Sequence, residues 1–356
     1  MRNYILVILI MAIGLCRAQS TKPSAANLEK LDEYMAKLDS KGFSGTILIA
    51  HGDSILHADG YGYRNLEQKK SNTVTTIFGT GSLTKQFTAA AILKLEMQGK
   101  LLVQDKISKY FSKVPAALSG IEIHHLLTHS AGFPVAIGSD YDKISEEEYI
   151  TKAFASAKHI EPGSEHEYSN VGYALLSIII EKVSGENYET FLRENLFNPA
   201  GMKNTGYLLP NWDEQNIAYG YSKKKVWGKP NEKPWDSDGP YLHLKGNGGI
   251  LSTVEDLFAW HLALLGDEIL SKEAKSKYYG KHIEEAPGDP SYYGYGWVII
   301  PTGGETDLIT HNGGNGVFFA DFWRLLEEEL TIILMSNKAN DFTVDLAVNV
   351  ARILLN

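Results

Sequence analysis

The sequence predicts an α+β fold in which one antiparallel sheet is built from both chain ends and flanked by helices, with an inserted, mainly helical lobe. Two β-rich runs, residues 43–50 and 55–60, stand near the N-terminus, and strand signals return only at 296–300, 316–323 and 330–335. Helical patterns fill the interval. The 356 residues, 44% hydrophobic and 22% charged, have the composition of a globular protein rather than a disordered or low-complexity chain.

The N-terminal elements follow from local periodicity. Apolar residues recur every three or four positions over residues 24–38, which predicts a helix that Gly42 ends. The two β-rich runs that follow flank a His-Gly-Asp turn and predict a hairpin. Ser82 then opens a strongly helical stretch through Gln98 that is apolar on most sides, so we expect this helix to be buried.

The middle and end of the chain complete the predicted architecture. Residues 222–240 are rich in Lys, Pro, Asn and Trp and predict a long surface loop. We expect a sheet lobe at about 25–80 and 290–356 and a helical lobe at about 82–285. Further helices are predicted at residues 121–128, 168–183, 188–196, 253–265 and 342–355.

The first 18 residues have the pattern of a cleavable secretory signal. Arg2 precedes an apolar run at residues 4–15, and Ala18 supplies the small residue before the cut. This run is too short for a stable membrane anchor. We therefore expect a mature chain of residues 19–356 that is secreted or periplasmic. Acylation of Cys16 is the competing interpretation, but Leu15 is larger than the residue such sites favour.

Charge and absent motifs exclude several function classes. The formal net charge of −9, from 34 basic and 43 acidic residues, repels a phosphate backbone, so nucleic acid is not an expected partner. The sequence has no phosphate loop and no Gly-x-Gly-x-x-Gly, and thus no signal for a nucleotide cofactor. It also lacks the Gly-x-Ser-x-Gly turn of α/β-hydrolases.

A Ser-x-x-Lys pattern occurs at Ser82-Leu83-Thr84-Lys85. Three residues apart on a helix, the hydroxyl and the amine share one face, where a buried, deprotonated lysine could take the serine proton. About two matches are expected by chance in a chain of this composition, and a second does occur, at Ser222 to Lys225. That copy sits in the predicted polar loop, where nothing would desolvate the lysine.

Two further elements carry possible chemistry. Tyr168-Ser169-Asn170 opens a predicted helix and can offer a phenol and a carboxamide to one cleft, whereas the matching Tyr63-Arg64-Asn65 follows the hairpin and predicts a surface turn. His311-Asn312-Gly313-Gly314 lies between strand signals. Its glycines permit close backbone approach, and an exposed strand edge can bind a peptide-like substrate.

In this order and at these spacings, the three elements resemble the serine β-lactamase and penicillin-binding-protein superfamily. The likeness is nearest to its class C β-lactamase-like branch of peptidases, esterases and β-lactamases, and it extends from about Phe43 to the C-terminus. It implies a β-lactamase/transpeptidase-like fold. Accessory stretches that look like the family's are His124 to Gly132, Gly246 to Thr253, and Ser336-Asn337.

The resemblance also implies roles for individual residues. Ser82 would be the acylating nucleophile and Lys85 its proton acceptor, with Tyr168 passing the proton to the leaving group and activating the deacylating water. Asn170 would hold the substrate amide and the Lys85 amine. The backbone N–H groups of Ser82 and Gly314 would form the oxyanion hole.

His311 and Gly313 belong to the third element and are expected to bind substrate, and His311 stands where β-lactamases of this branch usually carry lysine. Histidine is mostly neutral near pH 7, so no fixed cation meets a substrate carboxylate. We therefore expect an exported serine hydrolase that forms an acyl-enzyme on an amide or ester of a peptide or small molecule, with no cofactor. The alternatives are a class C-type β-lactamase and a non-catalytic peptide-binding module of the same fold.

Several questions stay open at this point. His125 and His129 are four residues apart, but no carboxylate follows at metal-site spacing, so no metal site is expected. Tyr292, Tyr293, Tyr295 and Trp297 could line a cleft or pack in the core. The natural substrate depends on the loops at residues 133–149 and 211–244, and the oligomeric state has no sequence signal.

Overall fold

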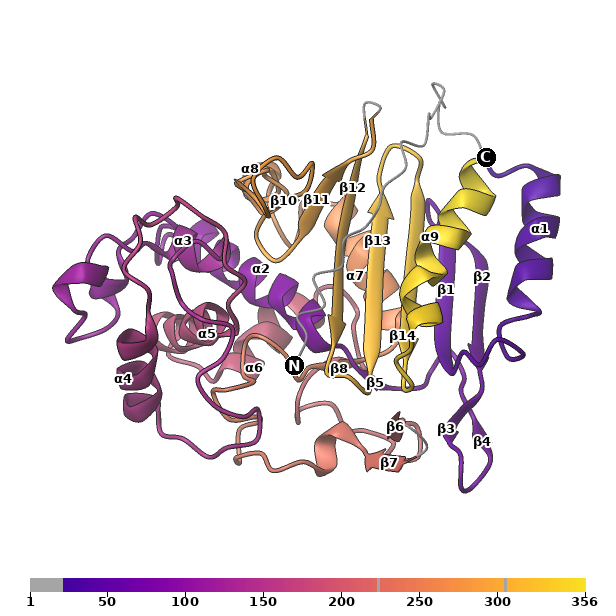
Figure 1. Ribbon diagram of the computed structural model, residues 1–356, viewed down its shortest axis with the longest axis horizontal. Coiled ribbons are helices and arrows are strands. Elements are labelled where there is room, and N and C mark those ends of the chain that lie inside the picture. The colour runs from indigo at the N-terminus through magenta and orange to yellow at the C-terminus, as the bar shows by residue number, and fades with distance from the viewer. Residues whose placement is uncertain (1–21, 223–224, 304–305) are drawn as a thin grey trace.

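The computed structural model describes residues 22–222, 225–303 and 306–356. The predicted signal sequence and Cys16 lie outside the described residues. Eight strands form one antiparallel sheet, which stands beside a mainly helical region (Figure 1). The strands are β1 (Gly45–His51), β2 (Ser54–Tyr61), β9 (Ile283–Glu284), β10 (Tyr292–Tyr293), β11 (Val298–Pro301), β12 (Asp307–Gly314), β13 (Phe319–Leu325) and β14 (Leu330–Ser336).

The strand order is β2-β1-β14-β13-β12-β11-β10-β9, so the two chain ends meet at the pairing of β1 with β14. This arrangement confirms the predicted α+β class with an antiparallel sheet assembled from both ends. Three two-stranded sheets accompany it. They pair β3 (Tyr63–Asn65) with β4 (Lys70–Ser71), β5 (Phe78–Gly79) with β8 (Leu251–Ser252), and β6 (Gly220–Ser222) with β7 (Lys225–Gly228).

Helices lie on both faces of the sheet, and others, joined by long loops, form the region beside it (Figure 1). The α-helices are α1 (Ala25–Met35), α2 (Thr84–Met97), α3 (Ile123–Leu127), α4 (Glu146–Ser156), α5 (Asn170–Ser184), α6 (Tyr188–Leu192), α7 (Val254–Leu265), α8 (Lys272–Tyr278) and α9 (Asp341–Leu355). Helical turns are η1 (Gly81–Leu83), η2 (Ile107–Lys109), η3 (Ala116–Leu118), the π-turn η4 (Arg193–Phe197) and η5 (Pro230–Glu232).

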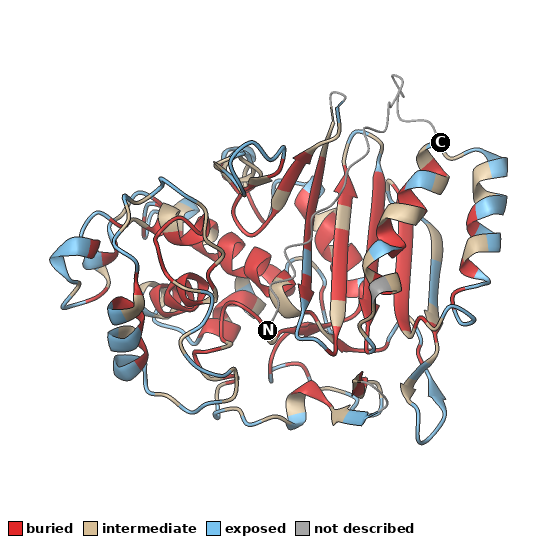
Figure 2. Ribbon diagram, viewed as in Figure 1, coloured by how far each residue is buried: buried red, intermediate tan, exposed pale blue. Residues whose placement is uncertain are grey.

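Both faces of the central strands are buried. On β1, Ile47 and Ile49 belong to the core cluster formed with α1 and α9, whereas the alternating Leu48 and Ala50 belong to the larger cluster that includes α7. The period of two places successive side chains on opposite faces of the sheet. Figure 2 shows these strands buried along most of their length, while α1 and α9 expose their outer sides to solvent.

Helix α2 lies in the middle of the molecule and packs against α5. Residues 84–93 and Leu95 of this helix are all buried, which confirms the prediction of a buried helix after Ser82. Ser82 itself lies in η1, the helical turn that leads into α2. The predicted helix thus begins as a tighter turn, and the nucleophile candidate stands at its entrance.

Some local predictions are wrong. The Tyr63 segment is the short strand β3 instead of a turn. The predicted surface loop at 222–240 contains β7 and η5, and Pro230 within it is buried. These short elements owe their form to tertiary contacts, which local propensity does not record. Helix α7, within the predicted helical lobe, instead packs on β1 and β14. None of the helices in the described ranges is both long and apolar enough to cross a membrane.

Candidate active site

The turn that carries Ser82 touches the end of strand β12. Gly81 has a left-handed φ of +54°, and a methyl group built on it would lie 2.5 Å from the backbone nitrogen of Gly314. A methyl group at Gly313 would lie 2.2 Å from the Thr80 carbonyl oxygen. Only glycines allow two backbones to come this close. The glycines beside His311 therefore bring the third sequence element against the first.

Lys85 lies one turn further along and is completely buried. Its Nζ is 3.1 Å from the Ser82 Oγ, 2.7 Å from the Asn170 Oδ1 and 2.8 Å from the Asn247 carbonyl oxygen. The structure thus joins Ser82, Lys85 and Asn170, which belong to two sequence elements 85 residues apart. None of the three oxygens carries a negative charge.

Burial dominates the electrostatics of this lysine. Removing an ammonium from water without a paired carboxylate is costly, and this lowers the pKa of Lys85 well below its usual range. The charge of Asp140 opposes the shift. Two tyrosine rings also lie near the amine, whose Nζ is 4.8 Å from the ring centre of the partly buried Tyr168 and 5.7 Å from that of the buried Tyr173.

Tyr168 and Asn170 are fixed by the start of helix α5. Ser169 is the N-cap residue, and its side chain accepts a hydrogen bond of 2.9 Å from the Gly172 backbone N–H. The Ser169 backbone N–H donates to the His129 Nδ1 at 3.0 Å, and the His129 ring lies 4.3 Å from the ring of Tyr168. Desolvation raises the pKa of Tyr168, while hydrogen bonding with Ser82 opposes that change.

Both ring nitrogens of His311 have partners other than Lys85. Its Nε2 lies 3.1 Å from the Tyr293 hydroxyl, and its Nδ1 lies 2.6 Å from the Asn312 carbonyl oxygen. A carbonyl accepts only, so Nδ1 carries the proton and Nε2 accepts from the phenol. Burial, reinforced by the charge of Lys85, lowers the pKa of His311 to about 3. Tyr293 is thereby a buried partner of the third element, not part of an open cleft.

A cavity of about 80 Å³, open to solvent, lies beside Ser82. Of the predicted site residues, Ser82, Asn170 and Gly314 line it, while Lys85, Tyr168, His311 and Gly313 stand behind this wall. The other lining residues are Gly79, Gly81, Asp140, Tyr141, Trp227, Pro230, Trp235, Leu244, Asn247, Gly248, Gly249, Asn315 and Phe318.

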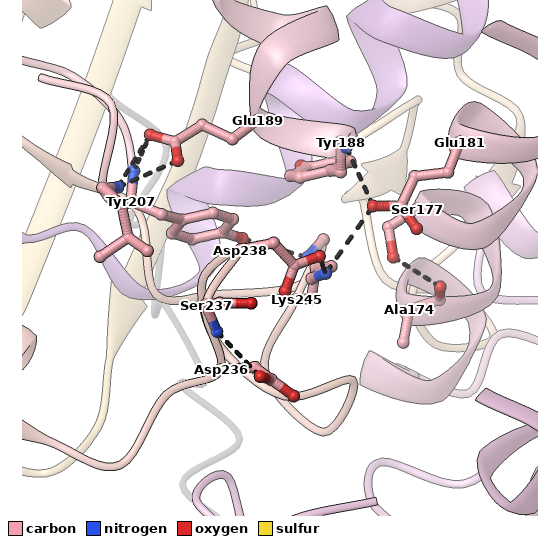
Figure 3. A network of polar contacts seen from close by, with 12 residues as sticks. Ala174, Ser177, Glu181, Tyr188, Glu189, Tyr207, Asp236, Ser237, Asp238 and Lys245 are labelled. Atoms are coloured by element: carbon pink, nitrogen blue, oxygen red, sulfur yellow. Dashed lines mark hydrogen bonds and ion pairs between the residues drawn. The ribbon is translucent and has the colours of Figure 1, made fainter. Parts of the chain in front are cut away.

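The segment that supplies the Asn247 carbonyl is held by a network of polar contacts, shown in Figure 3. Lys245 lies between Asp238, at 2.7 Å, and Glu181 of helix α5, at 3.7 Å. The Tyr207 hydroxyl donates to the Gly248 carbonyl at 2.8 Å and accepts from the Gly246 N–H at 3.1 Å. These contacts fix the backbone on both sides of the carbonyl that meets Lys85.

The contact of the Asn247 carbonyl oxygen with Lys85 was not predicted from the sequence. The signal was present in the glycine-rich stretch of residues 246–253, because Gly246 and Gly249 adopt left-handed φ values of +79° and +83°. Every residue has a backbone carbonyl, however, so the residue type at position 247 does not show that its carbonyl contacts Lys85. Within the described ranges, no group of histidine, cysteine or carboxylate side chains is arranged to hold a metal ion.

Comparisons with known proteins agree with this geometry. Residues 29–355 match the Beta-lactamase family. The chain is 31% identical to penicillin-binding protein 4* of Bacillus subtilis, over 86% of this chain and 70% of that protein. Other curated relatives are covered over 60% to 66% of their length.

Solved structures give the same result. The octameric penicillin-binding protein homologue of Pyrococcus abyssi superposes with a TM-score of 0.75 at 28% identity, covering 92% of this chain and 79% of that one. The penicillin-binding protein of Bacillus halodurans gives 0.76 at 25% identity, covering 88% and 98%. The fold is therefore β-lactamase/transpeptidase-like, and the chain belongs to the Beta-lactamase family of serine hydrolases, within the serine β-lactamase and penicillin-binding-protein superfamily.

Proposed function

We propose that this chain is an exported serine hydrolase that forms an acyl-enzyme at Ser82 and cleaves an amide or ester of a peptide or small molecule. The observation that carries the proposal is the buried, uncompensated amine of Lys85, 3.1 Å from the Ser82 Oγ. Export rests on the signal pattern of residues 1–18.

The contacts of Lys85 support its role as the base. A neutral amine has two N–H donors and one lone pair. The two shortest contacts of Nζ are with the Asn170 Oδ1 and the Asn247 carbonyl oxygen, which accept only. Both N–H groups are then used, and the lone pair is left for the Ser82 hydroxyl, the one neighbour of the three that can donate a proton.

The pKa of Lys85 is lowered and that of Tyr168 is raised, which assigns the two groups different roles in proton transfer. Burial favours a neutral Lys85 and a protonated Tyr168 phenol. Lys85 is therefore the acceptor of the Ser82 proton, and Tyr168 is the donor to the leaving group. In this division, Lys85 and Tyr168 are both uncharged before the substrate binds.

In the acylation step, the Ser82 Oγ bonds to the substrate carbonyl carbon while its proton moves to the Lys85 Nζ. The backbone N–H groups of Ser82 and Gly314 stabilise the oxyanion. The bond from the carbonyl carbon to the leaving nitrogen or oxygen then breaks, and the leaving atom takes a proton from Tyr168, which Lys85 reprotonates. In deacylation, a water gives a proton to the same pair while its oxygen bonds to the acyl carbon. The bond from that carbon to the Ser82 Oγ then breaks, and the pair returns the proton to Oγ, so one water is consumed per bond cleaved.

Intact-protein mass spectrometry tests this proposal. The chain is incubated with a fluorophosphonate and, separately, with a penicillin, and we expect one fluorophosphonate adduct that is lost in Ser82→Ala. The matched control is Ser222→Ala, which alters the second Ser-x-x-Lys pattern and should label normally. An adduct that persists in Ser82→Ala would overturn the assignment. The absence of any adduct in the wild type would favour the non-catalytic binding module.

A further inference from the structure

The cavity beside Ser82 combines one acidic side chain with several aromatic ones. Asp140 is the single carboxylate among its lining residues, and the lining contains no lysine, arginine or histidine. Tyr141, Trp227 and Phe318 also line the cavity and form its aromatic wall. The Tyr141 and Trp227 ring centres are 6.4 Å apart, and the Trp227 and Phe318 ring centres are 5.8 Å apart.

The Asp140 carboxylate has no hydrogen bond or ion pair with any residue that the structure describes. It interacts at longer range with His243 and with the buried Lys85. Its acidic neighbour Asp142, by contrast, accepts a hydrogen bond of 3.0 Å from the Ser139 N–H and does not line the cavity. Asp140 is therefore a partly buried carboxylate that faces the cavity without a protein counter-ion.

Two of the three lysines near the cavity are paired with carboxylates. Lys245 is paired with Asp238 at 2.7 Å, and Lys229 is paired with Glu214 at 3.0 Å. Lys233 lies 3.8 Å from the ring centre of Trp227 and donates to the carbonyl of the same residue at 2.5 Å. Lys233 thus has no carboxylate partner among the described residues, and none of these three lysines forms an ion pair with Asp140.

We propose that this cavity binds a substrate group that is cationic and apolar at once, such as an ammonium group carried on a hydrocarbon chain, with Asp140 as its counter-ion and the aromatic wall as its lining. The inference rests on the proposed function and names the class of substrate for the same site. Aromatic faces and a carboxylate attract a cation, and both weaken the binding of an anion. The site thus selects against substrates that present a carboxylate to this cavity.

The test uses three 4-nitrophenyl esters whose acyl chains have equal length and end in a methyl, a trimethylammonium or a carboxylate group. Release of nitrophenol gives kcat/KM for each, and chains of four to six carbons are compared because the optimal reach is part of the question. We expect the wild-type kcat/KM to be at least about tenfold higher for the cationic than for the neutral ester, and lowest for the anionic one.

Asp140→Asn removes the charge and keeps the shape of the side chain. We expect the cationic-to-neutral ratio to fall at least about fivefold, toward unity. Any effect of the substitution on Lys85 acts on all esters and cancels in the ratio. The matched control is Asp142→Asn, which removes the same charge from the same loop outside the cavity and should leave the ratio unchanged.

The outcomes separate the inference from the proposed function. Hydrolysis of the neutral ester that is lost in Ser82→Ala supports the function whatever the ratio. A ratio near unity in the wild type, or one unaffected by Asp140→Asn, would overturn the cation site alone. Preference for the anionic ester would also overturn it, and would direct attention to Lys233. If none of the esters is cleaved, the proposed function fails with it.

Discussion

The two Ser-x-x-Lys segments of this chain have the same pattern and very different surroundings. Ser82 and Lys85 enter a buried helix, where the amine is surrounded by three oxygens and two tyrosine rings. Ser222 and Lys225 face each other across the small β6–β7 sheet, and Lys225 is exposed. Burial without a counter-ion, and not the spacing of the two residues, makes a lysine a base near neutral pH.

The largest difference between the two segments should appear when their lysines are changed. We expect Lys85→Met to lower kcat/KM for a neutral ester by about 10²–10⁴-fold, because the base is removed, while Lys225→Met has no effect. Thermal unfolding of both variants controls for loss of structure.

The pH profile of the wild type bears on the same point. The neutral amine is present above the pKa of Lys85, which burial lowers. The kcat/KM should therefore reach its plateau well below the ordinary lysine value of 10.5. A rise in activity that follows an ordinary lysine would remove the distinction between the two segments.

The two Tyr-x-Asn segments allow the same kind of comparison, with a smaller expected effect on turnover. Tyr168 lies against the Lys85 amine, whereas Tyr63 is exposed on strand β3. We expect Tyr168→Phe to reduce ester turnover by about 10²-fold, since the phenol proton is lost but the ring remains, and Tyr63→Phe to leave turnover unchanged. Equal turnover in the two variants would show that the phenol does not move a proton. An amide substrate should suffer more than an activated ester, because its leaving group needs the proton.

Asp321 is a buried titratable group outside the site, and its protonation affects the free energy of unfolding. Asp321 on β13 accepts from the Trp323 Nε1 at 2.9 Å, and burial raises its pKa to about 7. The folded state then holds a proton that the unfolded chain releases above about pH 4. This contribution to stability is complete below pH 4 and declines as the pH rises toward 7.

Asp321→Asn should remove that decline. We expect the variant to gain roughly 1–3 kcal/mol over the wild type between pH 4 and pH 8, measured as free energy of unfolding by denaturant titration. The exposed Asp53, in the turn between β1 and β2, provides the control substitution. A difference between Asp321→Asn and the wild type that does not change with pH would show that Asp321 titrates normally in the folded protein.

Much of the fold could be predicted because its elements carry local signals. The β-rich apolar residues of β1 and β14 predict strands at the centre of the sheet. The apolar residues on most sides of α2 predict a buried helix. Strand β12 could not be predicted, because His311 to Gly314 have poor strand propensity and are held by their pairing with β13.

The site was accessible to sequence reasoning only in part. The apolar helix that follows Ser82 distinguished it from Ser222, which begins a polar segment. The resemblance to the superfamily predicted that Asn170 contacts the Lys85 amine. The residues that line the cavity could not all be predicted from the sequence. Trp227 lies in a segment whose Lys, Pro and Asn content predicts an exposed loop, and its inward position depends on packing against Phe318. Long-range contacts of this kind have no local pattern.

The pairing of β1 with β14 has a consequence for biosynthesis. Gly45 pairs with Ser336 and His51 with Leu330, so the central strands join segments almost 300 residues apart. During synthesis, β1 has only the hairpin partner β2 until residues 330–336 leave the ribosome. Contacts of such high sequence separation form slowly. The central pairing of the sheet therefore cannot form until β14 has been synthesised, although β1 and β2 are made near the start.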